Sequence, residues 1–307
     1  MATSTENGGS LTIRNPNGAL LDRAPHKNVD KFRAAIDYTA ATSGFRRELI
    51  EKDYFCSIVL AFLFSEETPL VFKGGTCLNK IHVGFYRLSE DLDFSIAMNI
   101  GATRGDRRKA MDPAKRQFSS IQKAVPALKI VSDLAGHNEG RQYTATLAYQ
   151  SAVAPMPGTI KFEVGLREPL FDEVQRSSSR TLIQDPFKKV DLLAVASVNC
   201  LSVREAFSEK IRAALTRKEP AIRDLFDLDY AIRHQKIDLN DAGLLDYARR
   251  KIAIPGTNAI DITASRVEAM RLQLKTELQP VLRQDDYDAF DFDQAVVQIV
   301  GLANVLK

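Results

Sequence analysis

The spacing of apolar residues changes along the chain and predicts a sheet region followed by a helical region. Apolar positions at helical intervals between residues 32 and 60 predict two helices separated near Gly44. Many Lys and Arg residues predict an exposed helix at 104–125, which Pro113 interrupts or divides. Continuous or alternating runs predict strands at 128–131, 142–149 and 159–164. Only helical patterns follow residue 192, at 204–217, 221–233, 241–252, 264–282 and 291–306.

This order of elements predicts an α+β fold with a mixed sheet flanked by helices and a C-terminal helical domain. Residues 1–28 are rich in Gly, Asn, Ser and Pro and are expected to form a flexible arm. We place the sheet domain at 29–186 and the helical domain at 187–307. The boundary at Pro186 follows the Ser-rich stretch 176–180.

The composition is that of a globular protein. It does not by itself identify a nucleic acid, a metal or a membrane as the partner. Hydrophobic residues make up 45% of the 307 residues and the net charge is +3, so any nucleic-acid site must be local. Cys56, Cys77 and Cys200 are widely separated and form no CxxC pair, which argues against a disulfide framework or a zinc site. Neither a signal peptide nor a membrane span is recognisable, and we expect a cytoplasmic protein.

The stretch 71–96 combines a glycine turn with two aspartates. Gly74 and Gly75 follow an apolar run and precede a helix-like segment, and the free N–H groups of a helix start attract phosphate. Asp91 and Asp93 open an alternating segment, and residues two apart in a strand point to the same face. Both carboxylates can therefore bind one cation, and oxygen ligands favour one or two Mg²⁺ ions bound to a nucleoside triphosphate.

The aspartate pair alone is weak evidence, because 39 acidic residues produce roughly five such pairs by chance. Three other pairs with the same spacing lie in or near predicted helices, where residues two apart point in different directions. Only Asp91 and Asp93 combine a strand context with an upstream glycine turn. Glu163, in the strand TIKFEV, is the best candidate for a third carboxylate, and the alternative is a strand residue that faces solvent.

Two further sets of residues either bind phosphate or are ordinary polar residues on helix surfaces. Thr76 and Lys80 share a helix face and can meet one phosphate chain, although such a lysine is most often solvated. Lys210 and Arg217 lie on one stripe of a later helix, which is also typical of an ordinary salt-bridged helix. Cys77 has no partner with a nucleophile signature and is interpreted as a buried structural thiol.

These segments together resemble the AbiEii-type nucleotidyltransferase toxins, within the polymerase-β-like nucleotidyltransferase superfamily. The resemblance covers most of residues 45–235 in the same order and spacing. The segments that carry it are LIEKDY at 49–54, FKGGTCLNK at 72–80, RLSEDLDFS at 87–95, the TIKFEV strand, FSEKIRAALTR at 207–217 and IRDLFDLDY at 222–230.

The resemblance implies a role for most of the candidate residues. It implies that Gly74, Gly75, Thr76 and Ser89 hold the triphosphate. It implies that Asp91 and Asp93 coordinate Mg²⁺, with Glu163 as a third acid by strand context alone. Lys210 and Asp224 would complete the catalytic site. Lys80, Arg217 and Arg223 would supply further positive charge towards phosphate or RNA.

The resemblance also implies an activity and partners. Members transfer nucleotides from a triphosphate to the 3′ acceptor end of tRNA and so block translation, and each toxin is paired with an antitoxin that acts directly or on transcription. The motifs do not specify the acceptor, so transfer to a protein or small-molecule hydroxyl stays open. Two non-enzymatic alternatives are a nucleotide-binding protein without turnover and a structural RNA-binding helical module, for which interleaved aromatic residues are missing.

Overall fold

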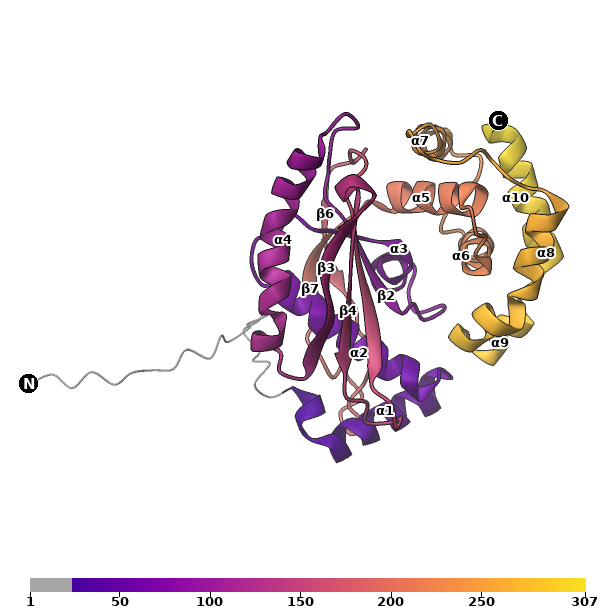
Figure 1. Ribbon diagram of the computed structural model, residues 1–307. Coiled ribbons are helices and arrows are strands. Elements are labelled where there is room, and N and C mark those ends of the chain that lie inside the picture. Colours follow the sequence, from indigo (N-terminus) through magenta and orange to yellow (C-terminus); the bar gives the residue numbers. More distant parts are fainter. Residues whose placement is uncertain (1–23) are drawn as a thin grey trace, which may run out of the picture.

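The computed structural model describes residues 24–307, and a mixed seven-stranded sheet forms the centre of this part of the chain (Figure 1). The strand order is β3-β4-β5-β2-β1-β7-β6. β2 runs parallel to β5 and β1 parallel to β7, while the remaining neighbours are antiparallel. The strands are β1 (Val71–Lys73), β2 (Asp91–Ser95), β3 (Leu128–His137), β4 (Gln142–Tyr149), β5 (Gly158–Gly165), β6 (Gln175–Ser179) and β7 (Ala196–Cys200).

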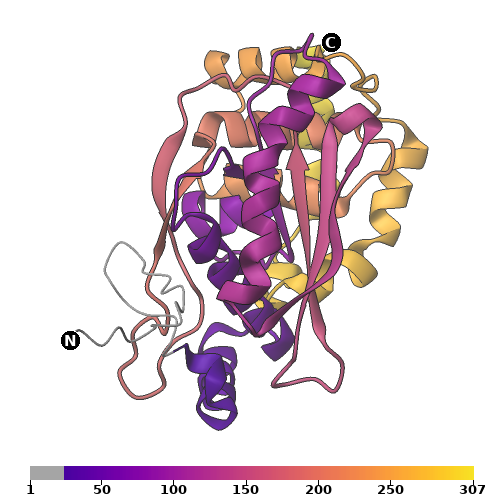
Figure 2. The same cartoon turned by 60° about the vertical axis from the view of Figure 1, so that its left-hand side comes forward.

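Three helices, α1 (Val29–Ser43), α2 (Arg47–Leu63) and α4 (Arg104–Ala124), pack with the sheet into the first hydrophobic core. In the turned view α4 lies in front of the sheet and the C-terminal helices lie behind it (Figure 2). Gly44 ends α1 in a left-handed conformation with φ 77°, as expected for the predicted break. α4 begins at a capping box formed by Thr103 and Asp106 and continues through Pro113.

The second hydrophobic core lies among the C-terminal helices. They are α5 (Val203–Thr216), α6 (Ile222–Arg233), α7 (Ala242–Ile252), α8 (Ala264–Leu272), the short α9 (Gln284–Asp288) and α10 (Phe292–Leu306). This core also includes Val71, Leu78, Tyr86 and Leu201 from the sheet region, so the two regions share buried contacts. The predicted α+β class, with a mixed sheet followed by helices, is confirmed. Within residues 24–307, no helix is long and apolar enough to cross a membrane.

Several boundaries differ from those predicted. β6 occupies the Ser-rich stretch that precedes the boundary placed at Pro186, and β7 extends the sheet to Cys200, beyond that boundary. β6 lies at an edge, where polar side chains face water, and neither strand has a strong apolar pattern. The helix expected at 264–282 leaves α-helical geometry after Leu272 and ends with a 3₁₀ turn that contains Pro280.

The flexible arm expected at 1–28 lies mostly outside the described residues, but its last part is packed. Ala24 is buried, and the Nδ1 atom of His26 is 2.7 Å from the hydroxyl of Tyr54 on α2. A 3₁₀ turn, Pro25–Lys27, leads directly into α1. Residues 24–28 therefore belong to the folded body.

Lys80 lies in the interior, although the sequence suggested a phosphate-binding role. Its ammonium is 2.6 Å from the carboxylate of Asp53 on α2 and donates to the hydroxyl of Ser57 at 2.8 Å. The side chains of Lys80 and Asp53 are 0% and 4% exposed. The predicted contact of Lys80 with phosphate is wrong, because this buried ion pair directs the side chain into the core between α2 and β6.

Removing one partner of this ion pair should be strongly destabilising, because the other charge is then buried alone. We expect Asp53→Ala to lower the free energy of unfolding by about 3–5 kcal/mol, because it leaves the Lys80 charge buried without its partner. Urea titration followed by circular dichroism measures the loss.

The neighbouring Lys52 provides a matched control. Its ion pair with Glu90 is 3.3 Å long and partly exposed, so Lys52→Ala should cost less than about 1 kcal/mol. A double variant, Asp53→Leu with Lys80→Met, removes both charges and should recover most of the loss. Similar losses in the two single variants would contradict this interpretation.

Candidate active site

The alternation of β2 positions two aspartates on one face of the sheet. Leu92 and Phe94 are fully buried against the helices of the first core, whereas Asp91 and Asp93 are only half-buried on the opposite face. The two carboxylates therefore point to the side of the sheet on which α3 (Gly74–Cys77) and the C-terminal helices lie (Figure 1).

Glu163 joins these aspartates through the parallel pairing of β2 with β5. The register places Asp93 beside Glu163 and Asp91 beside Lys161. Side chains of directly paired residues on neighbouring strands lie on the same face. Lys161 is 3.0 Å from Glu163, and Lys73 is paired with Asp93 across β1 and β2, so two ammonium groups accompany the three carboxylates.

Position 74 requires glycine because its backbone packs closely against Asp93. Its φ is +73°, and a Cβ atom added there would lie 2.9 Å from the Cβ of Asp93, closer than side chains tolerate. A Cβ on Gly75 would lie 2.6 Å from a guanidinium nitrogen of Arg87 and 3.0 Å from the hydroxyl oxygen of Ser89. The glycine pair therefore lets the start of α3 approach Asp93 on one side and Arg87 on the other.

The environment of Asp93 disfavours the ionised form of its carboxyl group. Burial, followed by repulsion from Glu163 and Asp91, raises its pKa to about 6, and Lys73 and Lys161 offset only part of this effect. A cation bound beside these carboxylates would relieve the repulsion. All the donors are oxygen atoms, which suits a hard divalent ion.

A buried network around Asp227 connects the glycine turn to the helical region. Asp227 on α6 accepts two hydrogen bonds from Arg87, at 2.5 and 2.7 Å, and one from the Tyr86 hydroxyl at 2.8 Å. The Lys210 ammonium, on α5, is 2.8 Å from the same carboxylate. Despite burial, Arg87 and Lys210 hold the pKa of Asp227 well below its usual range.

Lys210 also contacts Asp224, the second residue that the family resemblance implies for the catalytic site. The Lys210 ammonium donates to Asp224 at 2.7 Å, and the Arg217 guanidinium lies 3.1 Å from the other carboxylate oxygen. Burial disfavours the charge on Lys210, but Asp224 and Asp227 outweigh that effect and raise its pKa. The ammonium has three N–H donors, so one remains for a ligand.

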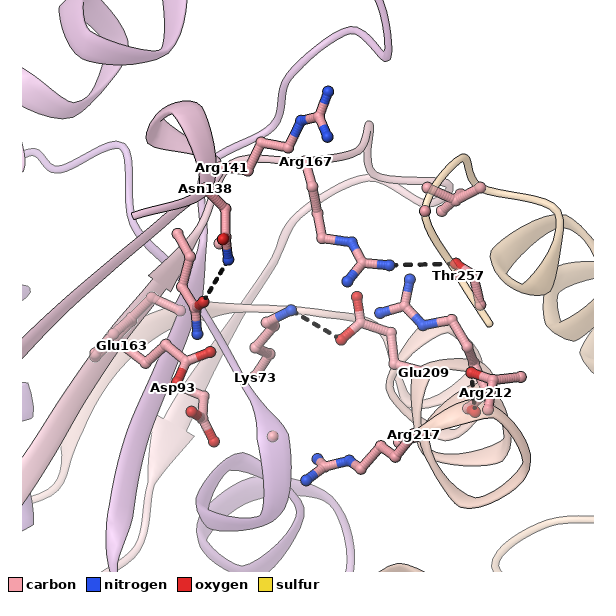
Figure 3. A pocket seen from close by; sticks show the side chains of 18 of the residues that line it. Lys73, Asp93, Asn138, Arg141, Glu163, Arg167, Glu209, Arg212, Arg217 and Thr257 are labelled. Carbon is pink, nitrogen blue, oxygen red and sulfur yellow. Dashed lines mark hydrogen bonds and ion pairs between the residues drawn. The ribbon is translucent and has the colours of Figure 1, made fainter. Parts of the chain in front are cut away.

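A cavity of about 920 Å³ lies between the sheet and the helices. Asp93 and Glu163 reach it from the sheet with Lys73 beside them, and Glu209, Arg212 and Arg217 extend from α5 (Figure 3). Its volume is at the upper end of the range for small-molecule sites. Basic side chains outnumber acidic ones in its wall, and the basic ones are Lys73, Arg141, Lys161, Arg167, Lys210, Arg212 and Arg217.

Arg167 contributes a positive charge that no carboxylate within residues 24–307 neutralises through an ion pair. Its guanidinium donates to the Thr257 hydroxyl at 3.3 Å, as Figure 3 shows. Burial and the nearby Arg212 charge lower its pKa. A phosphate group in the cavity would compensate this charge.

The structure brings together about half of the residues selected from the sequence. Those that line the cavity are Gly74, Asp91, Asp93, Glu163, Lys210 and Arg217. Those that do not are Gly75, Thr76, Lys80, Ser89, Arg223 and Asp224. Asp224 stands directly behind Lys210, whereas Arg223 is turned towards Glu277 at 4.0 Å. The Thr76 hydroxyl donates to the Asp91 carbonyl oxygen and so braces the aspartate strand.

Sequence reasoning missed the cations and carboxylates that complete the site. Lys73 precedes the glycine pair and is 3.1 Å from Glu209, which is 3.3 Å from the buried Lys251. Arg87 and Asp227 lay inside the quoted motifs but were given no role. Lys73 and Glu209 are 136 residues apart, so no local pattern could have paired them.

A family model described as "Nucleotidyl transferase AbiEii toxin, Type IV TA system" matches residues 61–297. No curated protein matches the sequence significantly.

Two solved structures from Helicobacter pylori are similar at low identity. JHP933 is 17% identical, with 85% of this chain and 93% of that chain covered and a TM-score of 0.49. A proposed nucleotidyltransferase is also 17% identical, with 91% and 93% covered and a TM-score of 0.45. Because the family model spans most of the sequence, the chain belongs to the AbiEii family of nucleotidyltransferase toxins of type IV toxin–antitoxin systems.

Proposed function

We propose that this nucleotidyltransferase transfers nucleotides from a nucleoside triphosphate to RNA, with the 3′ acceptor end of tRNA as the acceptor, in a reaction that depends on Mg²⁺. The observation that carries the proposal is the division of one cavity into an acidic and a basic wall. Asp91, Asp93 and Glu163 make the sheet side acidic despite Lys73 and Lys161, and Lys210, Arg212 and Arg217 make the facing helical side basic despite Glu209. The family membership supports the triphosphate and the antitoxin partner.

The carboxylates fit a magnesium site. Three carboxylates on two paired strands present only oxygen donors. Burial and then repulsion from Glu163 and Asp91 raise the pKa of Asp93, and a bound cation would offset that repulsion. Asp91 and Asp93 would hold the ion, with Glu163 as a third ligand. When bound, such an ion neutralises charge on the triphosphate and favours attack by a ribose hydroxyl.

The basic wall would orient the triphosphate. Lys210 keeps one donor free beyond Asp224 and Asp227, and Arg217 is 55% exposed beside it. Lys73 lies between the acidic wall and Glu209, within reach of both. These groups would stabilise the charge on departing pyrophosphate, while the Asp227 network holds Lys210 in place.

The remaining cations favour a polyanionic acceptor. Arg141 and Arg167 line the same cavity away from the Asp224 cluster, and Arg167 is not neutralised by an ion pair within residues 24–307. An RNA backbone would supply the phosphates that such residues bind. A small neutral acceptor would leave them without ligands.

An acceptor screen tests the function directly. Purified protein, Mg²⁺ and total tRNA are incubated with each labelled triphosphate in turn, and RNA is separated from protein and small molecules. We expect label on tRNA, at its 3′ end, from one or a few of the four nucleotides. Labelled protein or a labelled small molecule with unmodified tRNA would reject the RNA acceptor.

Asp91→Asn and Asp93→Asn should each reduce transfer by at least about 100-fold, because an amide is a poor ligand for a hard divalent ion. Mn²⁺ binding, followed by electron paramagnetic resonance, should fall in parallel. Asp288 belongs to a pair with the same spacing but is exposed on α9. Asp288→Asn should change neither quantity, and full activity of Asp93→Asn would reject the metal assignment.

Two arginines selected from the sequence allow a second matched test. Arg217 lines the cavity and Arg223 does not. Arg217→Ala should raise the KM for the triphosphate by about tenfold, as expected for the loss of a charge-assisted contact. Arg223→Ala should change it by less than about twofold. Equal effects in steady-state kinetics would show that the cavity is not the triphosphate site.

A further inference from the structure

Two cysteines and a histidine that are far apart in sequence meet beside the glycine turn. Cys77 is the last residue of α3, Cys200 is the last residue of β7, and His82 ends the helical turn Leu78–His82 that follows α3. The two sulfur atoms and a ring nitrogen of His82 all lie within 4.8 Å of one another. None of the three side chains lines the cavity, so this cluster is separate from the carboxylate site.

The two thiols form a polar pair in an otherwise dry interior. Both cysteines are 0% exposed, and the Cys200 sulfur accepts hydrogen bonds from the Cys77 thiol and the Ser177 hydroxyl. These bonds lower the pKa of Cys200 to about 7, whereas burial raises the pKa of Cys77. The two sulfur atoms therefore lie close enough together to bind one metal ion.

A backbone carbonyl holds one ring nitrogen of His82. Its Nε2 atom lies 3.0 Å from the carbonyl oxygen of Leu201, which can only accept, so Nε2 carries the proton. Nδ1 is then left with the lone pair. A backbone carbonyl that fixes the second ring nitrogen is the common support for a metal-bound imidazole. Burial lowers the pKa of His82 and favours the neutral ring that binds metals.

We propose that Cys77, Cys200 and His82 form a second metal site, for a thiophilic divalent cation such as Zn²⁺. Two thiolates and one imidazole match zinc and not Mg²⁺, and three protein ligands leave a fourth position for water. Binding forms two metal–sulfur bonds and one metal–nitrogen bond, and the two thiol protons pass to solvent. The thiolate charges cancel the charge of the ion, so the complex can be buried.

A metal ion at this site would link the glycine turn to the sheet. Phe72 of β1 is paired with Cys200, and α3 runs from Gly74, beside Asp93, to Cys77. A metal bound at the cluster would therefore fasten the far end of the glycine turn to β7. The site goes beyond the proposed transfer reaction and does not depend on it.

Zinc binding and cobalt substitution test the site in the reduced full-length protein. In excess Mg²⁺, which competes at the carboxylates, competition with a chromophoric chelator should show one Zn²⁺ per chain. Co²⁺ should give an absorption band from thiolate-to-metal charge transfer. Cys77→Ser and Cys200→Ser should abolish the band, and His82→Gln should weaken zinc binding by at least about tenfold.

Two controls separate this site from other metal and thiol effects. Cys56→Ser removes the buried cysteine outside the cluster, and Asp93→Asn alters the carboxylate site, so both should keep the band. Circular dichroism checks the fold of each variant, and half-buried His82 offers a test if a cysteine variant fails to fold. Unchanged zinc affinity in Cys200→Ser or His82→Gln, or wild-type protein without the band, would overturn the proposal. A Cys77–Cys200 disulfide without metal binding would also overturn it.

Discussion

The geometry of the candidate active site depends on the hydrogen bonds that the buried Asp227 carboxylate accepts. This carboxylate accepts hydrogen bonds from Tyr86 and Arg87, which follow the glycine turn, and from Lys210 on α5. These groups are buried, so loss of one partner would leave a charge without solvent or counter-ion. Arg87 also lies against Gly75. One carboxylate thereby positions the start of α3 and the lysine of the opposite wall.

The cleft separates charges in a way that matches its proposed chemistry. The parallel register of β2 and β5 concentrates carboxylates on the sheet, and α5 presents cations across the cavity. Burial, followed by neighbouring like charge, raises the pKa of Asp93 and lowers that of Arg167, so the charged form of each is disfavoured. A divalent cation would compensate the carboxylates on the sheet, and a phosphate chain would compensate the cations on α5. A nucleotidyltransferase binds a metal ion and a triphosphate in the same site.

Local patterns were sufficient for much of the fold and for part of the site. Alternation in β2 identified Asp91 and Asp93, and helical spacing located α5 and α6, which carry Lys210 and Asp224. The same reasoning failed at β6 and β7, whose small and polar residues resemble a linker. It also failed for Lys80, because a lysine beside a glycine turn has the same local pattern whether it faces phosphate or a buried aspartate.

The sequence by itself determined most of the strands and helices, with β6 and β7 as exceptions. It also placed the glycine pair and the two aspartates close together, because these features follow from neighbours along the chain. Only the tertiary structure decided which charges face the cavity. It brought Lys73 to Glu209, Arg87 to Asp227 and Cys77 to Cys200. These contacts join residues more than a hundred positions apart and form only when distant segments pack together, so no local pattern could have encoded them.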